Sequence, residues 1–265
     1  MPVRPLHCVL LFLANLVIQT SAIAQPSKPE LLLYCGITMV RPMTEIAQLF
    51  EKKENVKINI SQGGSEDLYQ AAKKSGVGDW YLPGEPAFRI KHLPEGLLGD
   101  YVTVGQNQMA LIVQKGNPKQ VKADPRELLR KDLVSILGNS ESGSVGKGAK
   151  DVLESLKIYP QALKASAFLA PDSRSLMNAM RKGEADITLS WRATAFFPEN
   201  VTKLEVIDFD AKLAQPQARQ LTLLKTTKQP QLTKRFMEFA SGDQGRAIFQ
   251  KYGFIPDPMT RSKSD

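Results

Sequence analysis

The feature that most constrains this fold is a regular alternation of short apolar segments with segments whose apolar residues recur at helical spacing. Residues 31–35 form such an apolar segment, and behind it Met43, Ile46, Ala47 and Phe50 fall on one face of a helix. The same order of strand, loop and helix returns several times along the chain. This order predicts an α/β fold in which mainly parallel sheets are flanked by helices.

The remaining strands and helices are expected between turns rich in glycine, proline, serine or aspartate. The expected strands are 56–60, 79–82, 109–113, 134–137, 187–191, 206–207 and 221–224. Helices are expected over 65–74 with Ser65 as N-cap, after 124–127, after 142–146, after Asp172, and over 230–252 with a break at 241–242. Parallel strands end together at one edge of a sheet, and the loops at that edge bind ligands. We therefore expect the function to lie in these loops.

The first 24 residues have the pattern of an export signal. Arg4 precedes an apolar run over 8–18, and an Ala-Ile-Ala cleavage site follows at 22–24. The run is too short to span a membrane. We expect a mature protein that begins at Gln25 and is soluble in the bacterial periplasm. Cleavage would remove Cys8 and leave Cys35 as a buried free thiol.

Composition and charge argue against several classes of function. The formal charge is +8, and removal of Arg4 would make it +7 because the first 24 residues hold no other charged side chain. The basic residues are spread along the chain without interleaved aromatics, so nucleic acid is not expected as a partner. His92 is the sole histidine after residue 24. This argues against a Ser-His-Asp triad and a His-rich metal site, and we expect no enzyme, metal or cofactor.

Four loops rich in glycine or hydroxyl residues each precede an expected helix. They are 36–38, 63–65, 143–146 and 172–173. Helix N-termini expose unpaired amide donors and partial positive charge. Several of them directed at one point would hold an oxyanion through hydroxyl and backbone N–H groups. Ordinary helix capping would equally explain any one of these loops alone.

In order and spacing, six segments resemble the periplasmic molybdate-binding protein family, which is part of the type II periplasmic binding proteins of ABC importers. They are the strand and turn at 31–39, Gln-Gly-Gly-Ser at 62–65, Asp-Trp-Tyr-Leu at 79–82, the segment 139–147, Gly-Glu-Ala-Asp at 183–186, and the ending 247–254. The resemblance implies two α/β lobes that close over an anion like a hinge. We expect residues 25–108 in the first lobe, 109–218 in the second, and 219–265 back in the first.

Carried over position by position, the family's ligand contacts fall on five residues. They are Thr38, Ser65, Val145, Ser173 and Trp191. Trp191 stands where the family commonly has a tyrosine, and it can donate only through its indole N–H. Arg192 follows directly and is a candidate counter-charge for a carboxylate, phosphate or similar oxyanion. A surface position at a strand end is an equal alternative for Arg192, since adjacent strand residues face opposite ways.

Three functions remain open. The first is capture of a small anion, molybdate-like or another oxyanion, by a monomer that delivers it to an ABC permease in the inner membrane. The second keeps the fold but presents the ligand to a membrane receptor or sensor kinase. The third is a periplasmic hydrolase with Ser65 or Ser144 as nucleophile, for which the sequence offers no suitable histidine partner.

A small group of sulfur side chains lies near the first of these loops. Cys35, Met39 and Met43 could bind a soft ion such as Cu(I). Packing in a core is the favoured interpretation, because free cysteine and methionine are commonly buried.

Overall fold

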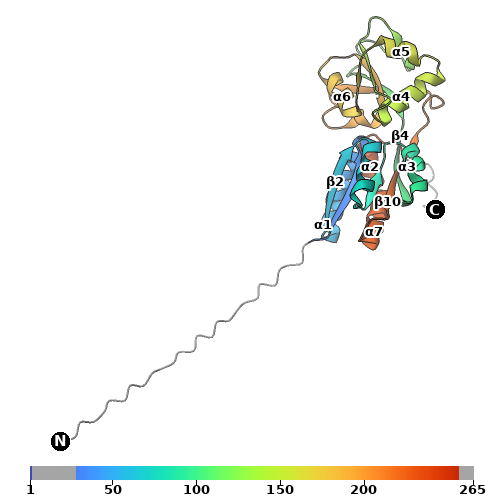
Figure 1. Ribbon diagram of the computed structural model, residues 1–265. Coiled ribbons are helices and arrows are strands. Elements are labelled where there is room, and N and C mark those ends of the chain that lie inside the picture. Colours follow the sequence, from blue (N-terminus) through green and yellow to red (C-terminus); the bar gives the residue numbers. More distant parts are fainter. Residues whose placement is uncertain (2–27, 257–265) are drawn as a thin grey trace, which may run out of the picture.

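The computed structural model describes Met1 and residues 28–256. The expected signal peptide, apart from Met1, lies outside the described residues. Within residues 28–256, no helix has the length and apolar character needed to cross a membrane. The described chain forms two lobes, each built on a five-stranded sheet (Figure 1).

The first sheet has the strand order β2-β1-β3-β10-β4. Its members are β1 (Glu30–Gly36), β2 (Lys57–Gly63), β3 (Trp80–Leu82), β10 (Gln217–Leu224) and β4 (Leu98–Asn107). β1 pairs in parallel with β2 and β3, whereas β10 is antiparallel to both β3 and β4. Among these strands β10 alone is therefore reversed.

The second sheet has the strand order β7-β6-β8-β5-β9. Its members are β7 (Ser166–Ala170), β6 (Ser135–Gly138), β8 (Ile187–Trp191), β5 (Met109–Gln114) and β9 (Leu204–Ile207). β6 is parallel to β7 and β8, and β5 is antiparallel to β8 and β9. The mainly parallel sheets expected from the sequence are confirmed, with one reversed strand among the described strands of each sheet.

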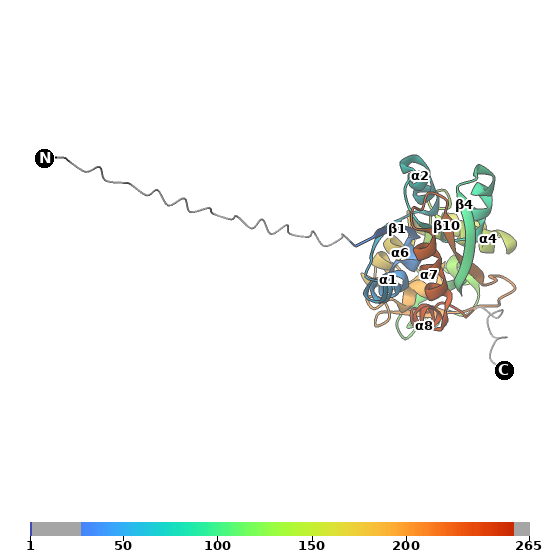
Figure 2. The same cartoon turned by 90° about the horizontal axis from the view of Figure 1, so that it is seen from below.

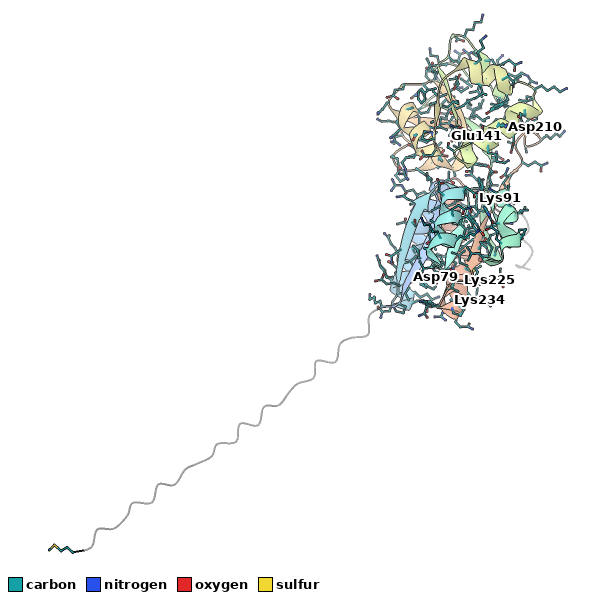
Figure 3. All side chains as sticks on the ribbon, viewed as in Figure 1. Asp79, Lys91, Glu141, Asp210, Lys225 and Lys234 are labelled. Carbon is teal, nitrogen blue, oxygen red and sulfur yellow. The ribbon has the colours of Figure 1, made fainter. Side chains whose placement is uncertain are left out.

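The reversed strands are the ones that enter a lobe from its neighbour. The chain leaves the first lobe after Asn107 and begins β5 at Met109, and it returns after β9 to begin β10 at Gln217. A strand that starts at the lobe boundary must run away from it, whereas β1 to β3 end there. Asp79 directly precedes β3. In Figure 3 it lies toward the end of the first lobe that is farther from the second lobe. Of the expected lobe limits, 108/109 falls between β4 and β5 and 218/219 falls inside β10; they stay a prediction.

Helices cover both faces of the first sheet (Figure 2). They are α1 (Val40–Glu54), α7 (Pro230–Ser241) and α8 (Asp243–Lys251) on one face and α2 (Ser65–Ser75) on the other, with α3 (Pro86–His92) and the short 3₁₀ helices η1 (Ile37–Met39) and η2 (Leu93–Glu95) beside them. β1 shows why both faces are covered: Leu33 and Cys35 are buried on the α1 side and Tyr34 on the α2 side, as the two-residue repeat of a strand requires.

The second lobe follows the same plan. Its helices are α4 (Ser144–Ser155), α5 (Tyr159–Ala165), α6 (Ser173–Arg181) and the 3₁₀ helices η3 (Pro125–Leu129) and η4 (Arg192–Phe196). Val152 and Leu153 of α4 and Met177 and Met180 of α6 are buried in one core with β6 and β8. Each lobe therefore buries its own apolar core, which allows the two lobes to move as separate bodies.

The sulfur group belongs to the core of the first lobe. Cys35 is a free, buried thiol, as expected, and Met39 and Met43 are fully buried beside it. Burial raises the pKa of the Cys35 thiol well above its ordinary value. Among the described residues no cluster of three or more His, Cys, Asp or Glu side chains is arranged to hold a metal ion.

Several elements differ from the sequence expectations. β4, α3, α5 and β7 were not expected, and residues 125–129 form a 3₁₀ helix. α2 begins at Ser65 with Gly64 as its N-cap, so Ser65 is the first helical residue instead of the cap. The prediction for Asp172 is confirmed, because its carboxylate accepts a hydrogen bond from Ser175 N–H at 2.7 Å.

Candidate functional site

A hollow of about 320 Å³, here called the central pocket, lies between the lobes at the carboxyl ends of strands from both sheets. Its lining residues are 36–38, 62–65, Asp67, Gly84, 142–145 and 171–174. The structure thus brings together four of the six residues predicted for the site. They are Thr38, Ser65, Val145 and Ser173, whereas Trp191 and Arg192 do not line this pocket.

Two serines at helix starts, one in each lobe, present hydroxyl groups at the central pocket. Ser65 Oγ accepts a hydrogen bond from the Gly84 N–H at 2.9 Å, and Ser144 Oγ accepts one from Trp191 Nε1–H at 3.2 Å. Among the described residues neither hydroxyl proton has an acceptor. Both hydroxyls are therefore free to donate, which suits a group that only accepts hydrogen bonds.

The starts of α2 and α4 add backbone donors to these hydroxyls. Their N-caps are Gly64 and Gly143, and within the described chain no side chain caps the first turn of either helix. The amides of these turns therefore remain unpaired, and the positive end of each helix dipole points toward the boundary. Val145 is the second residue of α4, its side chain buried and its backbone at the pocket wall.

The other two predicted residues line the same pocket in different ways. Ser173 is the buried first residue of α6, and its hydroxyl makes no hydrogen bond to the described protein. Thr38 is buried in η1, where its hydroxyl donates to Met39 Sδ at 2.8 Å. A thioether is a weak acceptor, so the Thr38 hydroxyl could turn toward a stronger one.

Two acidic residues follow Ser65 and would oppose an anion if they faced it. Glu66 is turned away, because its carboxylate accepts from Lys91 Nζ at 2.8 Å and contacts His92 Nε2 at 3.0 Å. Partial burial is the largest single influence and raises the pKa of Glu66. The hydrogen bonds that its carboxylate accepts outweigh burial together and lower this pKa to about 2. Asp67 lies exposed in the pocket wall.

Trp191 supports the pocket from behind instead of lining it. Its buried indole holds the Ser144 hydroxyl through Nε1–H, and the guanidinium of Arg219 lies over its ring at 4.3 Å from the centroid. Trp191 therefore positions a pocket residue.

Arg192 points to a different part of the molecule. Its Nε lies 3.1 Å from both carboxylate oxygens of Asp208, its Nη1 donates to the Gly253 carbonyl at 2.6 Å, and its guanidinium covers the Phe196 ring. It lines a separate hollow with these residues. The structure thus places Arg192 away from the central pocket, at the start of η4 and directly after β8 ends at Trp191.

Comparison with known proteins identifies the family of the chain. The family described as bacterial extracellular solute-binding protein matches residues 31–255. The molybdate-binding protein ModA of Mycobacterium tuberculosis is 21% identical over 227 residues, covering 85% of this chain and 84% of that protein. The match to the family spans well over half of the chain. The chain belongs to the bacterial extracellular solute-binding protein family.

Solved structures share the fold of this solute-binding protein. The periplasmic molybdate-binding protein of Azotobacter vinelandii superposes with a TM-score of 0.71 at 16% identity, covering 86% of this chain and 99% of that one. L-phospholactate-bound PEB3, a Campylobacter jejuni protein, gives 0.69 at 18% identity, covering 86% and 100%. The resemblance inferred from the sequence is confirmed, and identities this low establish the fold alone.

Two buried charged residues, Glu85 and Arg219, lie beside the central pocket of the solute-binding protein. Glu85 is 2% exposed, with Lys147 Nζ of the second lobe 3.8 Å from its Oε2 and no hydrogen-bond partner for Oε1 within the described chain. Burial raises the pKa of Glu85 to about 7, opposed by Lys147 and Arg219. Burial likewise lowers the pKa of the Arg219 guanidinium to about 9, opposed by Glu85.

Arg219, near the start of β10, contacts residues of both lobes. It is fully buried, donates to the carbonyls of Gly84 and Asn107, and lies over Trp191 of the second lobe. Sequence analysis missed Glu85 and Arg219, because no local motif marks them. One signal was present: Pro83-Gly84 follows an expected strand directly, as the other pocket loops do.

The single histidine of the described chain contacts residues that do not line the central pocket. His92 is buried and stacks on Tyr69 with ring centroids 3.6 Å apart. Its Nδ1 lies 2.6 Å from Glu95 and its Nε2 3.0 Å from Glu66. With both ring nitrogens facing carboxylates, His92 offers no free base to Ser65 or Ser144. Two of the relatives reported above, from Mycobacterium tuberculosis and Azotobacter vinelandii, are named as molybdate-binding proteins.

Proposed function

We propose that this protein captures a small solute carrying an oxyanion group in the periplasm and delivers it, as a monomer, to an ABC permease in the inner membrane. The observation that carries the proposal is the pair of serine hydroxyls, Ser65 and Ser144, whose lone pairs already accept hydrogen bonds from the protein. Their free O–H groups, with Ser173 and the starts of α2 and α4, make a cradle of donors. Family membership and the molybdate-binding relatives support it.

In the proposed mode of binding, hydroxyl and amide donors hold the oxyanion head group, and no metal ion is needed. Hydroxyl and amide donors match an acceptor-only group on all sides, and their orientation is fixed by the helices before the ligand arrives. Because the donors come from both lobes, a bound anion would link α2 and α4 and favour the closed arrangement.

A thermal-shift panel tests the proposal. Molybdate, tungstate, sulfate, phosphate, carboxylates and phosphonates are compared with Cu(I) as a soft-metal control. A ligand at one hundred times its dissociation constant adds about 2.7 kcal/mol of stability. We expect at least one oxyanion to stabilise the protein and the metal ion to have no effect.

Two substitutions locate the site of binding. Ser173→Ala removes a hydroxyl that has no partner within the described protein and should weaken binding of the selected anion about tenfold or more. Ser155→Ala, at the far end of α4 where Ser155 donates to the Val152 carbonyl, is the matched control and should leave affinity unchanged. Stabilisation by Cu(I) alone, or equal affinities in both variants, would contradict the proposal.

A further inference from the structure

A second, larger hollow opens directly beside the central pocket. It has a volume of about 520 Å³ and shares Ile37, Gln62, Ser173 and Arg174 with the central pocket. We call it the side pocket. Its walls come from α1 of the first lobe and from α6 and η4 of the second. The two hollows therefore adjoin between the lobes along these four residues, and each has a volume in the range of sites for organic ligands.

The side pocket carries an excess of positive charge. Three arginines line it, Arg41, Arg174 and Arg181, against one carboxylate, Glu199. Arg41 of the first lobe pairs with Glu199 of the second at 2.8 Å. Among the residues that the structure describes, the other two guanidinium groups have no carboxylate partner.

These two guanidinium groups are held in place by amide oxygens. Arg174 donates to Gln62 Oε1 at 2.7 Å across the lobe boundary. Arg181 donates to Asn200 Oδ1 at 2.6 Å and to Asn178 Oδ1, both within the second lobe. Amide oxygens orient a guanidinium without neutralising it, so both arginines remain available to a carboxylate or phosphate.

Part of the side-pocket lining is apolar. It consists of Ile37, Val40, Met177 and Phe197. A bare tetrahedral oxyanion would use the donors of the central pocket, where Arg174 also lies, and would leave the apolar side chains and the Arg181 guanidinium unused. A ligand with a short carbon skeleton would use both parts of the cleft.

We propose that the solute is a small organic acid with two acidic groups joined by a short carbon chain. Its oxyanion head binds at Ser65, Ser144 and Ser173, its carbons lie along the apolar part of the lining, and a terminal carboxylate binds Arg174 and Arg181. This inference rests on the proposed capture of an oxyanion and specifies the class of solute. It assigns Arg181 a role in specificity.

Isothermal titration calorimetry with the purified protein tests the inference through a matched pair of ligands. 3-Phosphonopropionate and propylphosphonate have the same head and chain length and differ in the terminal carboxylate. Sulfate serves as the bare oxyanion. We expect 3-phosphonopropionate to bind about tenfold or more tightly than propylphosphonate, as a charge-assisted hydrogen bond to arginine would provide.

Three arginine variants separate ligand binding from lobe closure. Arg181→Gln should remove most of the advantage of 3-phosphonopropionate and leave propylphosphonate unchanged, because both protein partners of Arg181 lie in its own lobe. Arg174→Gln also removes the interlobe hydrogen bond to Gln62, so it should weaken both ligands and should weaken 3-phosphonopropionate more. Arg41→Gln breaks an interlobe ion pair and should change both affinities by the same factor. Arg235→Gln, on the surface beside Glu54, is the control.

The outcomes distinguish the two proposals. If sulfate or propylphosphonate binds as tightly as 3-phosphonopropionate, the two-acid inference is overturned while oxyanion capture stands. If the advantage of 3-phosphonopropionate persists in both Arg181→Gln and Arg174→Gln, the side pocket is not where the carboxylate binds. If no anion binds, both proposals fail together.

Discussion

Replacement of Gly84 by alanine tests whether the central pocket forms by lobe closure. Gly84 lies between the lobes, and a Cβ atom there would come within 2.4 Å of Ser144 Oγ and 3.0 Å of Ser144 Cβ. Rotation of the hydroxyl would relieve the first contact but would break its bond to Trp191, and it would not relieve the second. Ser144 belongs to the opposite lobe, so the simplest relief is to open the cleft.

The size of the effect follows from the cost of overpacking. Inserting a methyl group into a filled contact typically costs about 1 to 3 kcal/mol. Because the open protein escapes this cost, it falls on the closed, liganded state alone. The affinity for the panel anion with the largest thermal shift should therefore drop about 5- to 150-fold, while the melting temperature without ligand changes little.

Calorimetry measures the affinity for the anion, and small-angle scattering measures whether the cleft stays open. Gly84→Ala should bind more weakly and keep a larger radius of gyration in the presence of the anion than the parent protein. Gly99→Ala is the matched control, because its nearest contact would be Leu223 at an ordinary 3.4 Å. An affinity within twofold of the parent, or an equal loss of stability with and without ligand, would refute the reasoning.

The remaining predictions concern buried groups of the first lobe. Arg219→Met should lower the free energy of unfolding in urea by about 3 kcal/mol, because it leaves Glu85 buried without this cation; a loss below about 1 kcal/mol would contradict the assigned role. The folded-state pKa of Glu85 is raised to about 7 from 4.5, so its contribution to stability is present below pH 4.5 and is lost as pH rises through about 7. The parent protein should therefore lose on the order of 2 kcal/mol relative to Glu85→Gln between about pH 5 and about pH 8 in urea titrations, and parallel pH profiles would argue against it. Cys35, whose thiol pKa is raised by burial, should react with a thiol reagent only after denaturation, and rapid labelling of the native protein would show that the thiol is accessible.

Much of the fold was predictable because its signals are local. The apolar period of α1, the Asp172 cap of α6 and the bounds of β8 each depend on a few neighbouring residues, and the structure agrees with the sequence there. β4 and β7 escaped prediction because they lack clear alternation: in β7 the neighbouring residues Phe168 and Leu169 are both exposed, although Leu169 pairs with Leu137 of β6. Their strand character depends on the neighbouring strands that they pair with.

For the candidate site, the sequence by itself determined which loops meet, and only the tertiary structure decided which side chains face the pocket. Order and composition placed Thr38, Ser65, Val145 and Ser173 at helix starts, and parallel strands bring such starts to one edge. The orientations of Trp191 and Arg192, and the burial of Arg219 between the lobes, depend on contacts between residues far apart in the chain. Such contacts leave no local pattern, because each partner is selected by the packing of the other lobe.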